Sequence, residues 1–557
     1  MLPSSLQGAK QATPSSTAAA HSALYRWADS KVIAALVLFR LINATLVKTY
    51  FSPDEYWQAL EVGHNITFGY GYLTWEWLVG LRSVLHPAVF AALYKVLSIL
   101  DLDDGSLFIF APRLLQALFA TLGDFYAYRF AYRLFENQVT ANWTLFLTVA
   151  SWWNFFCSTR TLANSMEASL TIVALYYWPF LGSTSGKTKG SLKLSLFIAS
   201  LTCIFRPTAA IMWLFLGVWL ILRLARQGRW ASIIYTGLNV LVIGGGAIFA
   251  SAVLDKSLLY NEWIWTPINF LRVNVLEGIS LFYGSSPWHW YLSQGLPILF
   301  GIYIPLVLIG SYHSFQAGTG LNASLERQVL YLSLWVLVVY SALQHKEWRF
   351  LYPILYPLLP FAGKTMQRLF LSSTNWKRSK SRIGIVAALV IVNAIMAWYT
   401  TLVHQRGVVD VMDWVRDTAR EARSQGQDLS FGFIMPCHST PWYSSVHIRD
   451  AKPLPMWFIT CNPPLGDIDP ATYKDESDFF YDDPVAFMDK RLKDRSPTTP
   501  KESHLVLFED LIRTTPDMLV WLNSQGYHEC ARFFNSHFHD DSRRRGDVLV
   551  YCTISPP

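Results

Sequence analysis

The chain has 557 residues, of which 52% are hydrophobic and only 15% are charged, and its formal net charge is +7. Ordinary soluble domains carry about a quarter charged residues, so the composition excludes a soluble globular protein and indicates a polytopic α-helical membrane protein. Much of the basic charge falls in short loops between apolar runs, where it reports membrane topology rather than binding to nucleic acid. We therefore expect no nucleic-acid partner.

The N-terminal part of the sequence divides into a polar tail and a series of apolar runs. Residues 1–30 are rich in Ser, Ala and Thr, and we expect them to form a disordered cytoplasmic tail. The first apolar run, from about Val32 to Tyr50, should act as an uncleaved signal anchor. Apolar runs recur as far as His404, and many can cross a hydrocarbon core of about 30 Å. We expect a membrane domain over residues 31–404.

Basic clusters predict the orientation of this domain, because positively charged loops stay in the cytoplasm. The clusters are Lys187–Lys193, Arg223–Arg229 and Lys377–Arg382. Counting apolar runs between them gives about eleven spans, with the N-terminus in the cytoplasm and the C-terminal region on the far side. Leu78–Leu100 is interrupted by charged residues and a proline, so we expect it to lie in the membrane interface.

This topology collects the unusual polar groups on the non-cytoplasmic face. The first are Asp54 and Glu55, adjacent carboxylates that follow Pro53 in an aromatic-rich loop. Ionisable groups at a membrane edge are costly to bury and therefore indicate function; the alternative is a solvated loop in which Asp54 caps the next helix. The other groups on this face are Trp75, Glu76, Arg160, Asn164, Arg206, His289, His345, Lys346, Glu347 and Arg349. Together they suggest a carboxylate base among phosphate-binding cations and sugar-stacking aromatics.

Arg206 stands at a special position, where Arg206-Pro207-Thr208 separates two short apolar runs. A charged side chain next to a helix-breaking proline is expensive inside a membrane unless it pairs with an anion. The alternative is an interfacial arginine whose side chain extends to the membrane surface. The sequence leaves both interpretations open.

Residues 405–557 are more polar and predict a small soluble α/β domain. We expect a helix over Asp413–Arg423 and strands over Leu429–Met435 and His504–Glu509. Four cysteines permit three disulfide pairings in an oxidising compartment, and we expect Cys437–Cys461 and Cys530–Cys552. A zinc site with His438 and His504 is the alternative, but no CxxC or HxxxH spacing supports it.

Several of these segments resemble a known enzyme family. The set Ser52–Glu55, Leu73–Glu76, Thr159–Leu162 and His345–Phe350 is similar to the motifs of the dolichyl-phosphate-mannose-dependent mannosyltransferases with the GT-C fold, glycosyltransferase family 22. Trp348 departs from that pattern, because the family often has a second acidic residue there. The stretches Met435–Tyr443 and Cys530–Asp541 resemble the branch of the family that acts in glycosylphosphatidylinositol (GPI) anchor assembly.

The resemblance implies an enzyme of the endoplasmic reticulum membrane with a lumenal active site. Its substrates would be dolichyl-phosphate-mannose and a GPI-precursor glycolipid, joined in α-1,2 linkage. Because the donor is β-linked, an α-linked product implies a single inverting displacement. A lipid phosphate leaving group gives no need for the metal that holds a nucleotide diphosphate, so we expect no metal and no cofactor.

The same resemblance implies a role for each polar group. Asp54 would be the base, with Glu55 orienting it or sharing its charge. The donor phosphate would be bound by Arg206, Lys346 and Arg349. The remaining substrate-binding residues would be Trp75, Glu76, Arg160, Asn164, His289, His345 and Glu347.

Two other functions stay open from the sequence. The first is an α-1,2-mannosyltransferase that extends the dolichol-linked N-glycan precursor. The second is a polytopic lipid transporter, which the absence of an internal repeat and the loop position of the carboxylates disfavour. Of the sequons at Asn43, Asn65, Asn142 and Asn322, we expect a glycan only at Asn65, because the others fall in the first span or in cytoplasmic loops.

Overall fold

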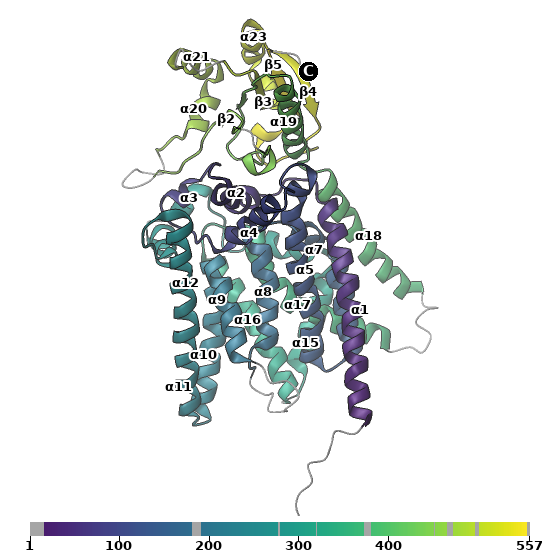
Figure 1. Ribbon diagram of the computed structural model, residues 1–557. Coiled ribbons are helices and arrows are strands. Elements are labelled where there is room, and N and C mark those ends of the chain that lie inside the picture. The colour runs from purple at the N-terminus through teal and green to yellow at the C-terminus, as the bar shows by residue number, and fades with distance from the viewer. Residues whose placement is uncertain are drawn as a thin grey trace, which may run out of the picture.

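Apolar helices packed side by side form most of the chain, and a small domain with a β-sheet lies on one end of the bundle (Figure 1). We call this end of the bundle the domain end. The computed structural model describes residues 16–180, 191–276, 279–318, 320–371, 380–449, 452–464, 472–495 and 501–553. The expected basic clusters at 187–189 and 377–379 lie outside the described residues, as do residues 1–15 of the expected tail.

The bundle contains long helices and several shorter ones. The long or apolar helices are α1 Ser16–Leu46, α5 Ser106–Phe135, α6 Gln138–Ala150, α8 Ala163–Tyr177, α9 Leu192–Phe205, α10 Ala210–Arg226, α11 Trp230–Asn239, α12 Gly245–Asp255, α15 Ile304–Gln316, α16 Leu321–Ala342, α17 Tyr352–Leu371 and α18 Lys380–Leu402. The other helices of the bundle are α2 Glu61–Phe68, α3 Trp75–Leu78, α4 Leu85–Ile99, α7 Trp152–Cys157, α13 Thr266–Leu271 and α14 Leu296–Phe300.

Five stretches of the described chain are long and apolar enough to cross a membrane by length and composition. They are Ser106–Phe135, Pro207–Arg226, Trp230–Tyr260, Tyr291–Gln316 and Lys380–Ser424. Other bundle helices are shorter or carry buried polar residues, so the expected count of about eleven crossings stays a prediction. The connection between α10 and α11 lies at the end opposite the C-terminal domain (Figure 1), as the expected orientation requires. Helix α4 lies with α2 and α3 at the domain end.

The N-terminal expectations need two corrections. Helix α1 already begins at Ser16, so the tail expected to be disordered through residue 30 is helical from Ser16, where Ala18–Ala20 favour helix. The same helix ends at Leu46 rather than Tyr50, and the chain then runs as a non-helical strap through Ser52. That strap leads directly into the acidic pair.

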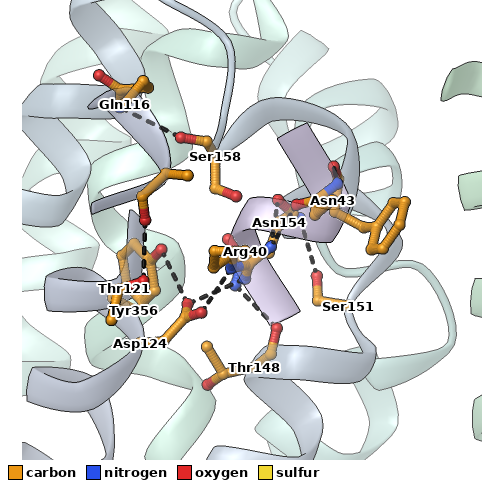
Figure 2. Close-up of polar contacts among 12 residues, drawn as sticks. Arg40, Asn43, Gln116, Thr121, Asp124, Thr148, Ser151, Asn154, Ser158 and Tyr356 are labelled. Atoms are coloured by element: carbon orange, nitrogen blue, oxygen red, sulfur yellow. Dashed lines mark hydrogen bonds and ion pairs between the residues drawn. The ribbon is translucent and has the colours of Figure 1, made fainter. Parts of the chain in front are cut away.

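A buried ion pair joins the helices in the middle of the bundle. The Arg40 Nε and Nη2 atoms donate to the Asp124 carboxylate at 2.6 and 3.0 Å, and both side chains are fully buried (Figure 2). Arg40 also donates to Asn43 at 2.8 Å and to the Asn154 carbonyl at 3.2 Å, while Tyr356 donates to Asp124 at 3.4 Å. The network connects α1, α5, α7 and α17, where apolar packing alone gives little specificity.

The C-terminal domain has the predicted α/β organisation. Its five-stranded sheet has the order β2-β1-β3-β5-β4, in which β1 is parallel to β2 and β3, and β5 is antiparallel to β3 and β4. The strands are β1 Phe431–Phe433, β2 Met456–Phe458, β3 His504–Phe508, β4 His528–Phe533 and β5 Val548–Cys552. The helices are α19 Gly407–Ser424, α20 Glu476–Asp482, α21 Pro484–Asp494, α22 Glu509–Thr514 and α23 Pro516–Ser524.

Disulfides in this domain follow the pairing expected from the sequence. The structure joins Cys437 to Cys461 and Cys530 to Cys552. The expected domain boundary at residues 404 and 405 falls in the connection between α18 and α19. These disulfides also use the cysteines of the two groups that could otherwise have held a metal, one with His438 and one with His504.

Removing one member of the Arg40–Asp124 pair should destabilise the protein more than removing both. Asp124→Leu leaves a buried guanidinium without its carboxylate, which costs roughly 3–5 kcal/mol in comparable buried pairs. The double variant Arg40→Met with Asp124→Leu removes both charges and should recover much of that loss. The measurement is the thermal unfolding midpoint in detergent, with the protein level in membranes alongside. A double variant no more stable than Asp124→Leu would contradict this account of the pair.

Candidate functional site

The acidic pair lies at the start of a helical segment that the strap after α1 positions. Helical geometry begins at Asp54, and consecutive residues of a helix point about 100° apart. Asp54 and Glu55 therefore face different surroundings, although they are neighbours in sequence. The exposed fraction of the side chain is 18% for Asp54 and 0% for Glu55.

Two arginines hold the buried Glu55 carboxylate. Arg160 Nη1 lies 2.8 Å from one oxygen and Arg113 Nη2 lies 3.2 Å from the other. Arg160 also donates to the Thr49 carbonyl at 2.7 Å and to the Thr49 hydroxyl at 2.8 Å, and Arg113 donates to the Val47 carbonyl at 2.5 Å. The arginines thus fix both the carboxylate and the strap that precedes it.

These contacts correct two expectations. Arg160 was expected to bind substrate, but it is fully buried and its donors bind Glu55, Thr49 and the Phe156 carbonyl. Glu55 was expected to orient Asp54 or to share its charge. Burial between two arginines excludes contact of Glu55 with substrate in this structure and leaves it a positioning role, because it fixes the backbone from which Asp54 projects.

Asp54 faces a cationic group from the other end of the sequence. Arg349 Nη1 lies 2.6 Å from an Asp54 carboxylate oxygen. Arg349 is itself held by Glu347, which accepts from its Nε at 2.6 Å and from its Nη2 at 2.9 Å. This bidentate geometry fixes the plane of the guanidinium. The structure therefore brings together three of the predicted site residues, Asp54, Glu347 and Arg349.

Neighbouring charges keep both Arg349 and Glu347 in their charged forms. Burial acts to raise the pKa of Glu347, but the charges of Arg349 and His345 outweigh it and hold that pKa well below its usual range. Burial acts to lower the pKa of Arg349, while Asp54 and Glu347 raise it above its ordinary value. Arg349 consequently stays a cation between two carboxylates.

Arg206 pairs with a carboxylate that the sequence analysis did not single out. Its Nε lies 3.2 Å from Glu167, its Nη1 donates to Asn164 at 2.9 Å, and its guanidinium lies over the Phe350 ring. Of the two interpretations of Arg206, pairing with an anion is therefore correct and an interfacial arginine is not. The anion is a carboxylate of the protein itself. Asn164 in turn donates to the Arg349 carbonyl at 3.2 Å and is 1% exposed. Both residues support the Arg349 loop instead of facing substrate.

Lys346 does not share a phosphate grip with Arg349. Its ammonium donates to the Ser286 carbonyl at 2.8 Å and to the Leu343 carbonyl, and the residue is only 7% exposed. Lys346 and Arg349 do not lie on one helical face, because the helical turn begins only at Trp348, after Lys346. Lys346 fastens its loop to the loop at Ser286, and Trp348 stacks on Trp290 between the same two loops.

Trp75 and Glu76 lie in a second polar cluster near Asp54. Trp75 is 6% exposed and its indole N–H donates to the Tyr283 hydroxyl at 2.7 Å. Glu76 accepts from Gln58 at 2.8 Å, from the Thr74 hydroxyl at 2.8 Å and from Arg82 at 3.3 Å. Gln58 links this cluster to the Asp54 segment.

The two remaining predicted residues are histidines, and they differ in position. His345 Nε2 lies 3.3 Å from a Glu347 oxygen, so this side chain belongs to the Arg349 cluster. His289 is exposed, and its nearest polar partner is Ser293 in its own turn at 3.4 Å. The structure therefore gives His289 no contact with the Asp54 cluster among the described residues.

A cleft beside Asp54 contains residues that the sequence analysis did not select. Asp54, Gln58, Arg82 and His86 line it together with apolar side chains from α3 and α9. The sequence signal for these residues is the charged interruption of the apolar run Leu78–Leu100, which also argues against a membrane crossing. The same interruption places polar groups at the mouth of the site.

The C-terminal domain packs directly on the Asp54 segment. Trp57 stacks on Trp442 with ring centroids 5.5 Å apart, and its indole N–H donates to the Thr440 carbonyl at 2.9 Å. Glu61 accepts from the Ser444 amide at 3.0 Å, and Tyr50 donates to the His438 carbonyl at 2.6 Å. The stretch Met435–Tyr443, recognised only by its resemblance, therefore holds the helical segment that begins at Asp54.

Comparisons with known proteins show the family of this chain. The model of the Alg9-like mannosyltransferase family matches residues 31–447. GPI mannosyltransferase 3 of Yarrowia lipolytica is 39% identical over 540 residues, which cover 95% of this chain and 98% of that protein. GPI alpha-1,2-mannosyltransferase 3 of Homo sapiens is 38% identical and covers 92% of this chain and 85% of its own length.

A solved structure shows the same fold. ArnT from Cupriavidus metallidurans bound to undecaprenyl phosphate superposes with a TM-score of 0.58 at 13% identity, covering 95% of this chain and 99% of that chain. ArnT has the GT-C fold of membrane glycosyltransferases, so the predicted fold class is confirmed. Because the family match covers most of the sequence and the relatives match over nearly their whole length, the chain belongs to the Alg9-like mannosyltransferase family.

Proposed function

We propose that this chain transfers mannose from dolichyl-phosphate-mannose in α-1,2 linkage to the second mannose of a GPI-anchor precursor, adding the third mannose. The reaction takes place on the lumenal side of the endoplasmic reticulum membrane. The names of the relatives that match nearly the whole chain support the acceptor and the linkage. The observation that carries the proposal is the Asp54–Arg349 pair at the domain end of the bundle.

Asp54 is the base in this mechanism. Its carboxylate accepts the proton of the acceptor 2-hydroxyl while that oxygen attacks the anomeric carbon of the donor mannose. The bond from the anomeric carbon to the phosphate oxygen breaks on the opposite face, which inverts the configuration. Glu55 and Glu167 are at most 2% exposed and are paired with arginines, whereas Asp54 keeps an exposed edge.

Arg349 stabilises the leaving phosphate. A guanidinium has five N–H donors, and the contacts to Asp54 and Glu347 use three of them. The remaining donors are available for phosphate oxygens, where a charge-assisted hydrogen bond strengthens as the negative charge develops. Arg349 thus places the leaving group and the base at a fixed distance from each other.

The mechanism uses no metal. The carboxylates of Asp101 and Asp103, which form an Asp-x-Asp pattern, are both paired with Arg449. The leaving phosphate monoester anion is stable without protonation, and a cation supplies the neutralising charge. A divalent cation added at Asp54 would compete with Arg349 for the carboxylate.

Asp54→Asn should abolish mannose transfer while leaving the protein level nearly unchanged, because the amide cannot accept the proton. In cells that lack this chain, the wild type should clear a GPI intermediate with two mannoses, and Asp54→Asn should let it accumulate. Glu55→Gln is the matched control: it breaks the double arginine contact and should lower the protein level. An active Asp54→Asn enzyme would end the base assignment. Accumulation of a truncated N-glycan precursor would identify the alternative acceptor.

Arg349→Lys should weaken use of the donor more than use of the acceptor, because lysine cannot reproduce the forked geometry of arginine. Initial rates of purified protein, measured against each substrate in turn, should show a rise in the donor KM of about tenfold, the size of one charge-assisted hydrogen bond. Arg206→Lys is the control, since Arg206 pairs with Glu167. Equal losses for both substrates with a falling protein level would argue for a purely structural Arg349.

A chelator should leave the rate unchanged. Purified protein supplied with preformed dolichyl-phosphate-mannose is assayed with EDTA and again after addition of Mg²⁺ or Mn²⁺. The expected result is the same initial rate in all samples, because Arg349 supplies the charge that a metal provides in other transferases. A rate that falls with EDTA and returns with the metal would refute the metal-free mechanism.

A further inference from the structure

His86 is a buried histidine at the wall of the cleft beside Asp54. It follows Leu85 at the start of α4 and is 5% exposed. Its ring packs edge-on against Phe90 and Phe205, with centroid distances of 5.4 and 5.6 Å. These contacts fix the ring plane, so the ring nitrogens keep a constant direction.

Apart from the indole N–H of Trp77, which also lacks a partner among the described residues, the other polar side chains of this cleft have partners. Gln58 and Arg82 both donate to Glu76, Ser83 donates to Asp255 at 2.9 Å, and Asp54 pairs with Arg349. His86 Nε2 is buried and has no hydrogen-bond partner among the described residues. A buried polar atom left without a partner is destabilising, and a phenylalanine would make the same apolar contacts without that penalty.

The imidazole is neutral. Burial lowers the pKa of His86 to about 3, and the nearby charges of Arg82 and Arg206 act in the same direction. A neutral imidazole presents one N–H donor and one acceptor nitrogen. Depending on the tautomer, Nε2 can therefore either donate a hydrogen bond to a hydroxyl group or accept one from it. A sugar hydroxyl, which both donates and accepts, fits either tautomer.

We propose that His86 Nε2 hydrogen-bonds a hydroxyl of the acceptor sugar and so positions the neighbouring hydroxyl toward Asp54. The inference rests on the proposed function, because it takes Asp54 as the base. The sugar that His86 binds is the acceptor rather than the donor, because the hydroxyl that loses its proton to Asp54 belongs to the acceptor. Asp54 and His86 line the same cleft. The ligand class is a hexose with adjacent free hydroxyls.

The test compares two substitutions in the purified full-length protein. His86→Phe keeps the packing against Phe90 and Phe205 and removes the hydrogen bond, while His86→Gln can place an amide group near the Nε2 position. With saturating dolichyl-phosphate-mannose and a dimannosyl GPI precursor at varied concentration, His86→Phe should lower kcat/KM for the acceptor by roughly 10- to 100-fold. His86→Gln should recover most of that loss, and the donor KM should not change in either variant.

His504→Phe is the matched control. His504 is 1% exposed, and its Nε2 also lacks a partner among the described residues, but it lies in β3 of the C-terminal domain. Its replacement should leave the acceptor kcat/KM of folded protein unchanged. Equal losses at His86 and His504 would show a general effect of removing buried imidazoles and would overturn the proposal.

Three other outcomes also overturn it. They are a His86→Phe enzyme within twofold of the wild type, a rise in the donor KM alone, and failure of both His86 variants to fold, which would make the residue structural. Failure of the proposed function gives a different result: the wild type would then reject the GPI precursor and use another mannosyl acceptor. The His86 variants are in that case compared on the acceptor that the wild type uses.

Discussion

Two buried arginines around one buried carboxylate fix the geometry on which the site depends. Burying an ion costs several kcal/mol unless a partner and further hydrogen bonds satisfy it, so Glu55, Arg113 and Arg160 must stay together for the chain to fold. Arg113 comes from α5 and Arg160 from the connection between α7 and α8. Their contacts with the strap after α1 tie three separate parts of the bundle to one turn of helix. The backbone of the neighbouring Asp54 is thereby held in place by residues other than Asp54 itself, and its carboxylate pairs with Arg349.

The sequence predicted the class of protein, its fold class and the disulfide pairing, and it named Asp54, Glu347 and Arg349, which the structure brings together. Each prediction rested on a local signal, such as apolar length, charge in short loops, or a carboxylate at a membrane edge. Residue spacing alone did not show which of the two adjacent carboxylates faces outward, and the choice of Asp54 as the base came from the family resemblance. Which carboxylate faces outward depends on a helical rotation of about 100°, which residue spacing does not reveal before the start of the helix is known.

A second limit on prediction from the sequence is the pairing of charges that lie far apart in the chain. Glu167 and Arg113 lie inside apolar runs, and their charge was a visible signal of function or pairing. Their partners, Arg206 and Glu55, lie about 40 and 60 positions away in the chain, so only the packed bundle shows which charges meet. Lys346 shows the same limit, because the carbonyls that bind it belong partly to another loop. A cation in a sequence motif therefore predicts a pairing, but not whether the partner is substrate or protein.

The contact between Trp57 and the Thr440–Trp442 segment has a consequence for the order of biosynthesis. Residues about 385 positions apart in the chain hold the turn that begins at Asp54, and the segment from the C-terminal domain is itself anchored by the Cys437–Cys461 bridge. A nascent chain that has inserted all of its helices still lacks this support for the turn that begins at Asp54. Catalytic competence thus arrives only after the last 150 or so residues are translated, oxidised and docked, so unfinished or misoxidised molecules remain inert in the membrane.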